Sequence, residues 1–388
     1  MASIVARFFA SELHDLRIVE HGGEGVGVFV APFAQEEARV MADIRFDGCA
    51  GQAAPPRWGL AQHGRTAAAT GKPGYSRTIA GAAAGSIVDG RSRDRWEAWM
   101  FNPTALVAEA LGRHLADTYD RRFGGREPEY GRILESAGRL VIEWIANSDA
   151  LYHNTNHTAL STLVGEAILR GRLLRQPLEP ADWLHFTLAL IMHDIGYVRG
   201  ACPGDEADRF VIDESGATVT LKRGASDAAL APYHVDRSMI FVRHRFKSVP
   251  GVDEERIARA IEMTRYPVPK DGQHDDTDTE AGLVRAADLI GQLADPLYLR
   301  RLNALYYEFL ETGMAERCGY TSPADMIEKY PAFFWENVEP YIGDALGYLE
   351  LTIEGKQWIA NLYGHVFTIE HARRRLGPHL VPKGGEMS

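Results

Sequence analysis

Hydrophobic residues recur every three or four positions over most of the chain after about residue 95. One such stripe comprises Ile133, Ala137, Leu140, Val141, Trp144 and Ile145. An α-helix makes one turn in about 3.6 residues, so this spacing gathers the apolar side chains on one face. The same period recurs in segments 160–168, 257–264, 283–293, 299–310 and 355–375. The pattern predicts an all-α helical bundle over residues 96–375.

Two stretches depart from the amphipathic period. Residues 183–192 (WLHFTLALIM) are nearly all apolar, which predicts a helix buried on most sides. Residues 210–212 and 218–221 are rich in β-branched and aromatic residues and flank a polar turn, Asp213 to Gly216. This arrangement is typical of a β-hairpin. We therefore expect a small β-hairpin inserted into the helical domain.

The first 95 residues lack a sustained period. Residues 48–85 are rich in glycine and alanine and contain Pro55 and Pro56. Such a composition favours a weakly ordered extension, to which the sequence assigns no role. Residues 376–388 form a polar C-terminal tail.

Composition narrows the class of protein. The 388 residues are 45% hydrophobic and 24% charged, as in globular proteins. The formal net charge of -11 argues against a nucleic-acid partner. The three cysteines form no CxxC pair, and no run of 18 apolar residues or signal peptide is evident. We expect a soluble cytoplasmic protein with no membrane partner.

Candidate chemistry begins at Tyr152–His157 (YHNTNH). Its two histidines, His153 and His157, are four residues apart, which on a helix places them on the same side. An inert pair on a helix surface is the alternative interpretation.

A second candidate is the pair His193 and Asp194, which ends the most apolar segment. Burying an imidazole beside a carboxylate is costly unless something compensates them, and a divalent cation would do so. The alternative is a helix-capping aspartate beside a hydrogen-bonded histidine. A third candidate, Asp288, lies in an otherwise apolar helix, where a salt bridge to Arg285 is the alternative.

The ordered set of His157, His193–Asp194 and a distant Asp288 resembles the HD superfamily of metal-dependent phosphohydrolases. Within it, the spacing is most similar to the catalytic domain of cyclic nucleotide phosphodiesterases. The matching segments are YHNTNH at 152–157, HD at 193–194, EMTRYP at 262–267 and AADL at 286–289, within about residues 140–310. The resemblance implies an all-α bundle in which His157, His193, Asp194 and Asp288 bind a metal. It also implies that His153 is the general acid.

The resemblance implies one or two divalent ions as cofactors, either zinc, manganese, magnesium or iron. Cyclic nucleotide phosphodiesterases continue the second motif as HDxxHPG, whereas Tyr197 stands here at the position of their extra histidine. The Gly-Tyr-Pro signature of cyclic-di-GMP hydrolases is also absent after the HD pair. His234 is the favoured additional metal ligand, with a surface histidine as the alternative, and His244 is a weaker candidate.

Further groups could line the same cavity. Gln292 follows Asp288 by one helical turn, and aromatic residues between 298 and 335 could stack against a base or belong to the core.

These features predict hydrolysis of a small phosphoester, a nucleotide or cyclic nucleotide, by metal-activated water. Two alternatives stay open. A di-iron oxygenase on the same fold would need more histidine ligands, and a regulatory protein would hold a vestigial site.

Overall fold

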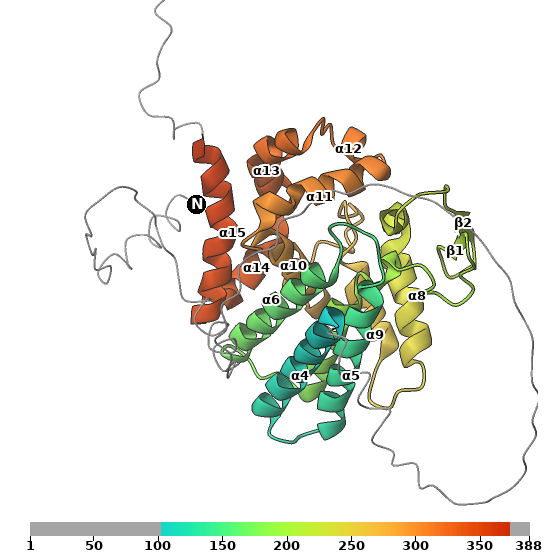
Figure 1. Ribbon diagram of the computed structural model, residues 1–388. Helices are drawn as coiled ribbons and strands as arrows, with labels where there is room; N and C mark the ends of the chain where they lie inside the picture. Colours follow the sequence, from blue (N-terminus) through green and yellow to red (C-terminus); the bar gives the residue numbers. More distant parts are fainter. Residues whose placement is uncertain (1–101, 373–388) are drawn as a thin grey trace, which may run out of the picture. The chain divides into compact units, whose positions relative to one another are not determined.

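The computed structural model describes residues 102–372, so the predictions for residues 1–95 and 376–388 lie outside the described residues. The described part is an assembly of helices with one small sheet, which confirms the all-α prediction (Figure 1). The elements are α4 (Pro103–Phe123), α5 (Pro128–Ile145), α6 (Thr155–Leu173), α7 (Pro180–Met192), η1 (Ile195–Tyr197), β1 (Arg209–Val211), β2 (Thr218–Thr220), η2 (Asp227–Tyr233), α8 (His234–Phe246), α9 (Glu254–Glu262), α10 (Glu280–Leu293), α11 (Tyr298–Glu311), α12 (Met314–Arg317), α13 (Pro323–Asn337), α14 (Glu339–Leu349) and α15 (Ile353–Ala372).

Helix α7 lies in the core, as its apolar sequence predicts. Every side chain from Trp183 to Met192 is buried, and the helix packs against α5, α6, α9 and α10. Its one imidazole, His185, is satisfied at both nitrogens. Nδ1–H donates to the Ala181 carbonyl oxygen at 2.6 Å, and Nε2 accepts from the Asp253 backbone N–H at 2.7 Å. A buried polar group is thus compensated, as the interior requires.

Small residues bring α6, α7 and α10 into close contact. A Cβ atom on Gly165 of α6 would lie 2.0 Å from Leu190 Cδ1 of α7. A Cβ atom on Gly291 of α10 would lie 2.5 Å from Ser161 Cα of α6. Both positions therefore require glycine. The contact between Gly291 and Ser161 sits about one turn from two site candidates, one on each helix.

The predicted hairpin is present, with its strands displaced by about one residue. Strands β1 and β2 are antiparallel and pair Phe210 with Val219. Arg237 of α8 is fully buried and donates to the Val211 carbonyl oxygen, to the Gly196 carbonyl oxygen and to both oxygens of Asp205. Its guanidinium thereby fixes the hairpin to the turn that follows His193 and Asp194.

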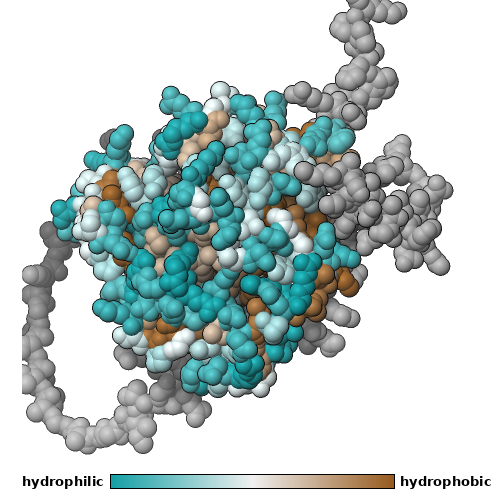
Figure 2. All heavy atoms as spheres, turned by 180° about the vertical axis from the view of Figure 1, so that it is seen from behind, coloured by the Kyte–Doolittle hydropathy of each residue, from teal (hydrophilic) through white to brown (hydrophobic). Residues whose placement is uncertain are grey.

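Helix α10 begins directly after the acidic run at residues 274–278. Thr279 is the N-cap, and its hydroxyl accepts from the Gly282 backbone N–H at 3.1 Å. The surface view in Figure 2 shows mostly hydrophilic residues with separate hydrophobic patches. Within residues 102–372, no helix is long and apolar enough to cross a membrane.

Candidate metal centre

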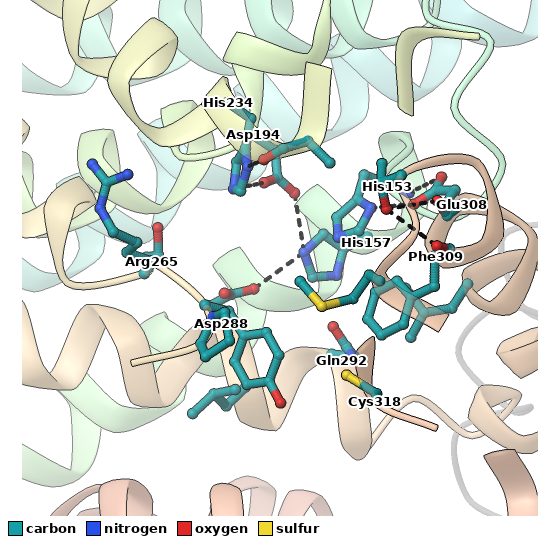
Figure 3. A pocket seen from close by; sticks show the side chains of 18 of the residues that line it. His153, His157, Asp194, His234, Arg265, Asp288, Gln292, Glu308, Phe309 and Cys318 are labelled. Carbon is teal, nitrogen blue, oxygen red and sulfur yellow. Dashed lines mark hydrogen bonds and ion pairs between the residues drawn. The ribbon is translucent and has the colours of Figure 1, made fainter. Parts of the chain in front are cut away.

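Donor atoms of His157, His193 and Asp194 lie within 4.8 Å of one another in the core, and Asp288 approaches both imidazoles. Figure 3 shows His157 between Asp194 and Asp288. His157 Nε2 lies 3.2 Å from Asp194 Oδ2, 3.1 Å from Asp288 Oδ1 and 3.3 Å from His193 Nε2. His193 Nε2 lies 3.2 Å from the same Asp194 oxygen and 3.3 Å from the same Asp288 oxygen. Donors about 2.0 to 2.2 Å from one ion lie about 3.0 to 3.5 Å apart in tetrahedral or octahedral coordination. The separations fit a single divalent ion.

The four ligands come from three packed helices. His157 lies in the first turn of α6, Asp288 lies in α10, and His193 and Asp194 follow the last residue of α7. His157, His193 and Asp194 are at least 95% buried. The alternative partner of Asp288 is not used, because Arg285 donates instead to the carbonyl oxygens of His274 and Asp276.

The polar atoms of the cluster are left incompletely satisfied by the protein. His193 Nδ1–H donates to the Leu190 carbonyl oxygen at 2.6 Å, which leaves its Nε2 lone pair to face the cluster. Asp194 Oδ2 is buried and makes no hydrogen bond to any described residue. Buried polar atoms of this kind call for a partner, and a cation among two imidazoles and two carboxylates would be one. The residues therefore fit a divalent metal ion.

The histidines and carboxylates of the cluster shift one another's pKa values. Burial disfavours the His157 imidazolium, but the neighbouring carboxylates of Asp194 and Asp288 outweigh that cost and raise the pKa of His157 to about 9. The same carboxylates raise the pKa of His193 well above its usual value. Burial works against the Asp194 carboxylate, yet the charge of His193 holds the pKa of Asp194 well below its usual range. A site that stabilises positive charge on its histidines can stabilise a cation in the place of their protons.

His153 lies beside the cluster but outside the helix to which the spacing assigned it. Helix α6 begins at Thr155, because the side chain of Asn154 caps it by accepting from the Asn156 backbone N–H at 3.0 Å. The prediction that His153 and His157 share a helix face is therefore wrong. The two rings nevertheless lie 5.5 Å apart between centroids, because the turn before α6 folds over the cluster.

Glu308 of α11 fixes His153. His153 Nδ1–H donates to Glu308 Oε2 at 2.5 Å, while Oε1 accepts from the backbone N–H groups of Tyr152 and His153. Glu308 is almost fully buried, which disfavours its charge, but the charge and hydrogen bonds of His153 prevail and lower the pKa of Glu308. The ring of His153 is therefore oriented with Nε2 as its free nitrogen.

Tyr197 and His234 lie next to His153 and Asp194 at the centre. The Tyr197 ring packs against the His153 ring (4.5 Å between centroids, 12° between planes) and against the His234 ring (4.5 Å, 28°), and these two imidazoles lie 6.5 Å apart. His234 Nδ1–H donates to the Ala231 carbonyl oxygen, and His234 Nε2 lies 3.8 Å from Asp194 Oδ1. His234 is thus directed to the site and is not a surface histidine. His244 is exposed and does not line the pocket.

A pocket of about 490 Å³ opens from the centre. Gln292 lines it, as do three of the aromatic residues considered from the sequence, Tyr298, Phe309 and Phe333. Of the others, Tyr306 and Phe334 belong to the core, whereas Tyr307 and Trp335 are exposed. The aromatic segment therefore divides between the pocket wall, the core and the surface.

A protein-family model described as Npun_R2479-like matches residues 101–372. The chain belongs to the Npun_R2479-like family. The match spans every described element and all residues of the candidate centre. No curated protein and no solved structure matches this family member.

Glu308 is the site residue of this Npun_R2479-like protein that the motifs did not indicate. It lies 155 positions after His153 and belongs to none of the matching segments. A signal was present, because Glu308 is a carboxylate inside an apolar helical stripe that includes Leu302, Leu305 and Phe309. The same reasoning identified Asp288.

Proposed function

We propose that this protein is a metal-dependent phosphohydrolase of the HD type that hydrolyses a small phosphoester. The observation that carries the proposal is the convergence of His157, His193 and Asp194, with Asp288 3.1 to 3.3 Å from the two imidazoles, because these are the residues that the HD resemblance implies as ligands. His157, His193, Asp194 and Asp288 would hold the ion. A divalent ion bound there would polarise a phosphoryl group and activate water for attack.

The protein's own groups supply the proton step. Phosphoester hydrolysis releases an alkoxide, which needs a proton as the bond to phosphorus breaks. His153 lines the pocket, and its Nδ1–H is held by Glu308, so a proton on Nε2 faces the reacting group. We assign His153 as the general acid and Glu308 as the residue that positions it.

His234 supports a second cation position. Its Nε2 lone pair is directed toward Asp194 Oδ1, the oxygen that the first cluster does not use. Asp194 would then bridge two ions through its two oxygens. We propose His234 as the additional ligand.

The geometry favours hydrolysis over the di-iron oxygenase. A second iron would need further histidines, and the described pocket offers only His234 and His153 outside the first cluster. His153 is already engaged by Glu308. A vestigial regulatory site is less consistent with a ligand set that retains four converging donors.

The test combines elemental analysis with hydrolysis of bis(p-nitrophenyl) phosphate in the presence of Mn²⁺, Mg²⁺ or Zn²⁺. We expect one or two equivalents of metal and turnover that EDTA abolishes. Asp194→Asn should lower turnover by at least about 100-fold and remove the metal, because it removes a ligand charge from a buried site. Asp208→Asn is the matched control, since Asp208 is exposed on the approach to the hairpin and should tolerate the change.

Iron with dioxygen consumption and no hydrolysis would instead establish the oxygenase. Metal without turnover across a broad phosphoester panel would favour the regulatory alternative. Full metal content and full activity in Asp194→Asn would refute the assignment of the site itself.

A further inference from the structure

The pocket has two chemically different ends. At one end lies the candidate metal centre with His153, Glu308 and His234. The other end, here called the distal chamber, is formed by α11 to α13, which contribute none of the four ligands of the centre. In Figure 3, Phe309, Gln292 and Cys318 lie on one side of His157 and Asp288, whereas Asp194 and His234 lie on the other. The organic part of a substrate bound at the centre would extend into this chamber.

The distal chamber is lined mainly by aliphatic, aromatic and thioether side chains. Helices α11 and α13 provide most of them, namely Leu302, Leu305, Phe309, Met326, Tyr330 and Phe333. Gln292 and the Cys318 thiol, whose pKa burial raises, are uncharged, whereas Arg317 of α12 brings one positive charge to this end of the pocket. A pocket of about 490 Å³ is large enough for a ligand of drug-like size.

Two of the three arginines that line the pocket, Arg265 and Arg285, already donate hydrogen bonds to several protein acceptors. Arg265 donates to both carboxylate oxygens of Asp236 and to both of Glu262, at 2.7 to 3.0 Å. Arg285 is 2% exposed, donates to two backbone carbonyl oxygens and lies over the Tyr341 ring, 4.4 Å from its centroid. Arg285 has no carboxylate partner among the described residues, and neither has Arg317, which is exposed.

This charge distribution limits how many phosphates the pocket can hold. Sites for polyphosphates use several free lysines, arginines or backbone N–H groups to bind the chain of negative charges. The described pocket contains no lysine. Beyond the metal centre, a second or third phosphoryl group would meet mainly neutral and apolar side chains at a high desolvation cost, and Arg317 is the one cation that the described residues bring to the distal chamber.

From these observations we propose that the substrate carries a single phosphoryl group bonded to a bulky apolar or aromatic group that occupies the distal chamber. The proposal rests on the proposed phosphohydrolase function and narrows it to a substrate class. Nucleoside triphosphates and other polyphosphates are excluded by the same argument. Phe309 becomes a specificity-determining residue, because it lines the chamber one position after the residue that holds His153.

The experiment compares two diesters with the same leaving group and charge. The full-length, metal-loaded protein is given p-nitrophenyl methyl phosphate and p-nitrophenyl 1-naphthyl phosphate, with ATP as the polyphosphate probe. We expect kcat/KM for the naphthyl ester to exceed that for the methyl ester by about 10- to 100-fold, from burial of the ring system. ATP should not be hydrolysed at a comparable rate.

A pair of variants tests the location. Phe309→Ala should lower the naphthyl-to-methyl ratio by at least about threefold, because it removes an aromatic wall from the chamber. Leu310→Ala is the matched control, since Leu310 is the next residue on α11 and is 54% exposed. Its ratio should equal that of the wild type.

A binding measurement separates the two proposals. Calorimetry compares 1-naphthylphosphonate with methylphosphonate on the metal-loaded protein, and neither ligand can be hydrolysed. Hydrolysis with a ratio near one, or a preference for ATP, would overturn the substrate class and leave the phosphohydrolase intact. No hydrolysis, but tighter naphthylphosphonate binding that Phe309→Ala weakens, would overturn the phosphohydrolase and leave the chamber assignment intact. If the protein neither hydrolyses the diesters nor binds naphthylphosphonate more tightly than methylphosphonate, both proposals are overturned.

Discussion

At the scale of single residues, the candidate centre depends on which nitrogen of each histidine is occupied. His193 and His234 each donate Nδ1–H to a backbone carbonyl oxygen three residues earlier, and His153 donates Nδ1–H to Glu308. In all three, Nε2 is left for chemistry. Backbone carbonyl oxygens thus hold His193 and His234 in the tautomer suited to metal binding. The Glu308 carboxylate holds His153 in the tautomer suited to proton transfer.

The role of Glu308 makes a prediction that depends on the leaving group. Glu308→Gln keeps the shape of the side chain but replaces the carboxylate that holds His153 Nδ1–H with a neutral amide. We expect kcat to fall about 10- to 100-fold for phenyl phosphoesters, whose departing oxygen needs a proton. For p-nitrophenyl esters the loss should be below about threefold, because that leaving group departs as a stable anion.

Turnover of both esters, followed beside the metal content of each preparation, checks this prediction. Metal content should be unchanged, and Glu316→Gln, on the exposed surface of α12, should behave as wild type. Equal losses on the two esters would show that Glu308 supports the fold or the metal and not proton transfer.

Sequence patterns indicated residues of the candidate centre because these are anomalies in their own segments. Asp288 is a polar residue in an apolar helix, His193 and Asp194 directly follow one, and such residues need a compensating partner. The Glu308–His153 hydrogen bond could not be predicted in the same way. It joins a turn to a helix 155 positions later, and no local pattern shows that the two meet.

At the scale of elements, the turn η1 connects the metal ligands to α8. The Ser238 hydroxyl accepts from the Gly196 backbone N–H at 2.9 Å and donates to the His193 carbonyl oxygen at 2.6 Å. A Cβ atom on Gly196 would lie 2.0 Å from the His234 carbonyl oxygen. The absence of a side chain at Gly196 therefore lets α8 approach closely enough for His234 to reach Asp194.

Gly196→Ala should consequently separate η1 from α8. We expect a loss of about 1 to 3 kcal/mol in the free energy of unfolding, as for overpacking in other cores, together with weaker metal binding. Urea unfolding and metal titration measure the two effects. Gly343→Ala is the control, because a Cβ atom there meets nothing within 4 Å and alanine favours the helix. If the two variants are equally stable, the contact at Gly196 does not fix α8.

Local patterns predicted the elements better than their ends. The buried helix α7 and the inserted hairpin lie where the residue pattern predicts them, the first strand of the hairpin one residue earlier. His153 and His157 have helical spacing but do not share a helix. Asn154 lies between them and favours the N-cap position, so α6 begins after His153. The hydrogen bond of a single side chain decides that boundary.

At the scale of the whole molecule, the candidate centre connects segments that are distant in the sequence. Its ligands lie on α6, after α7 and on α10, which span residues 155 to 293. These helices already pack closely through glycines at positions 165 and 291. A bound ion would add a further link among them in the folded state only, since the unfolded chain does not bring the four donors together.

Metal removal should therefore lower the stability of the full-length protein. Ion present at 100 times its Kd stabilises the folded state by about 2.7 kcal/mol, so EDTA should lower Tm by several degrees. Thermal unfolding followed by circular dichroism, at increasing metal concentrations, measures the effect. Asp194→Asn should unfold at the same temperature with and without metal, whereas Asp208→Asn should respond as the wild type does. A Tm that rises with metal equally in all three proteins would place the stabilising ion elsewhere, because only one of them lacks a ligand charge at the centre.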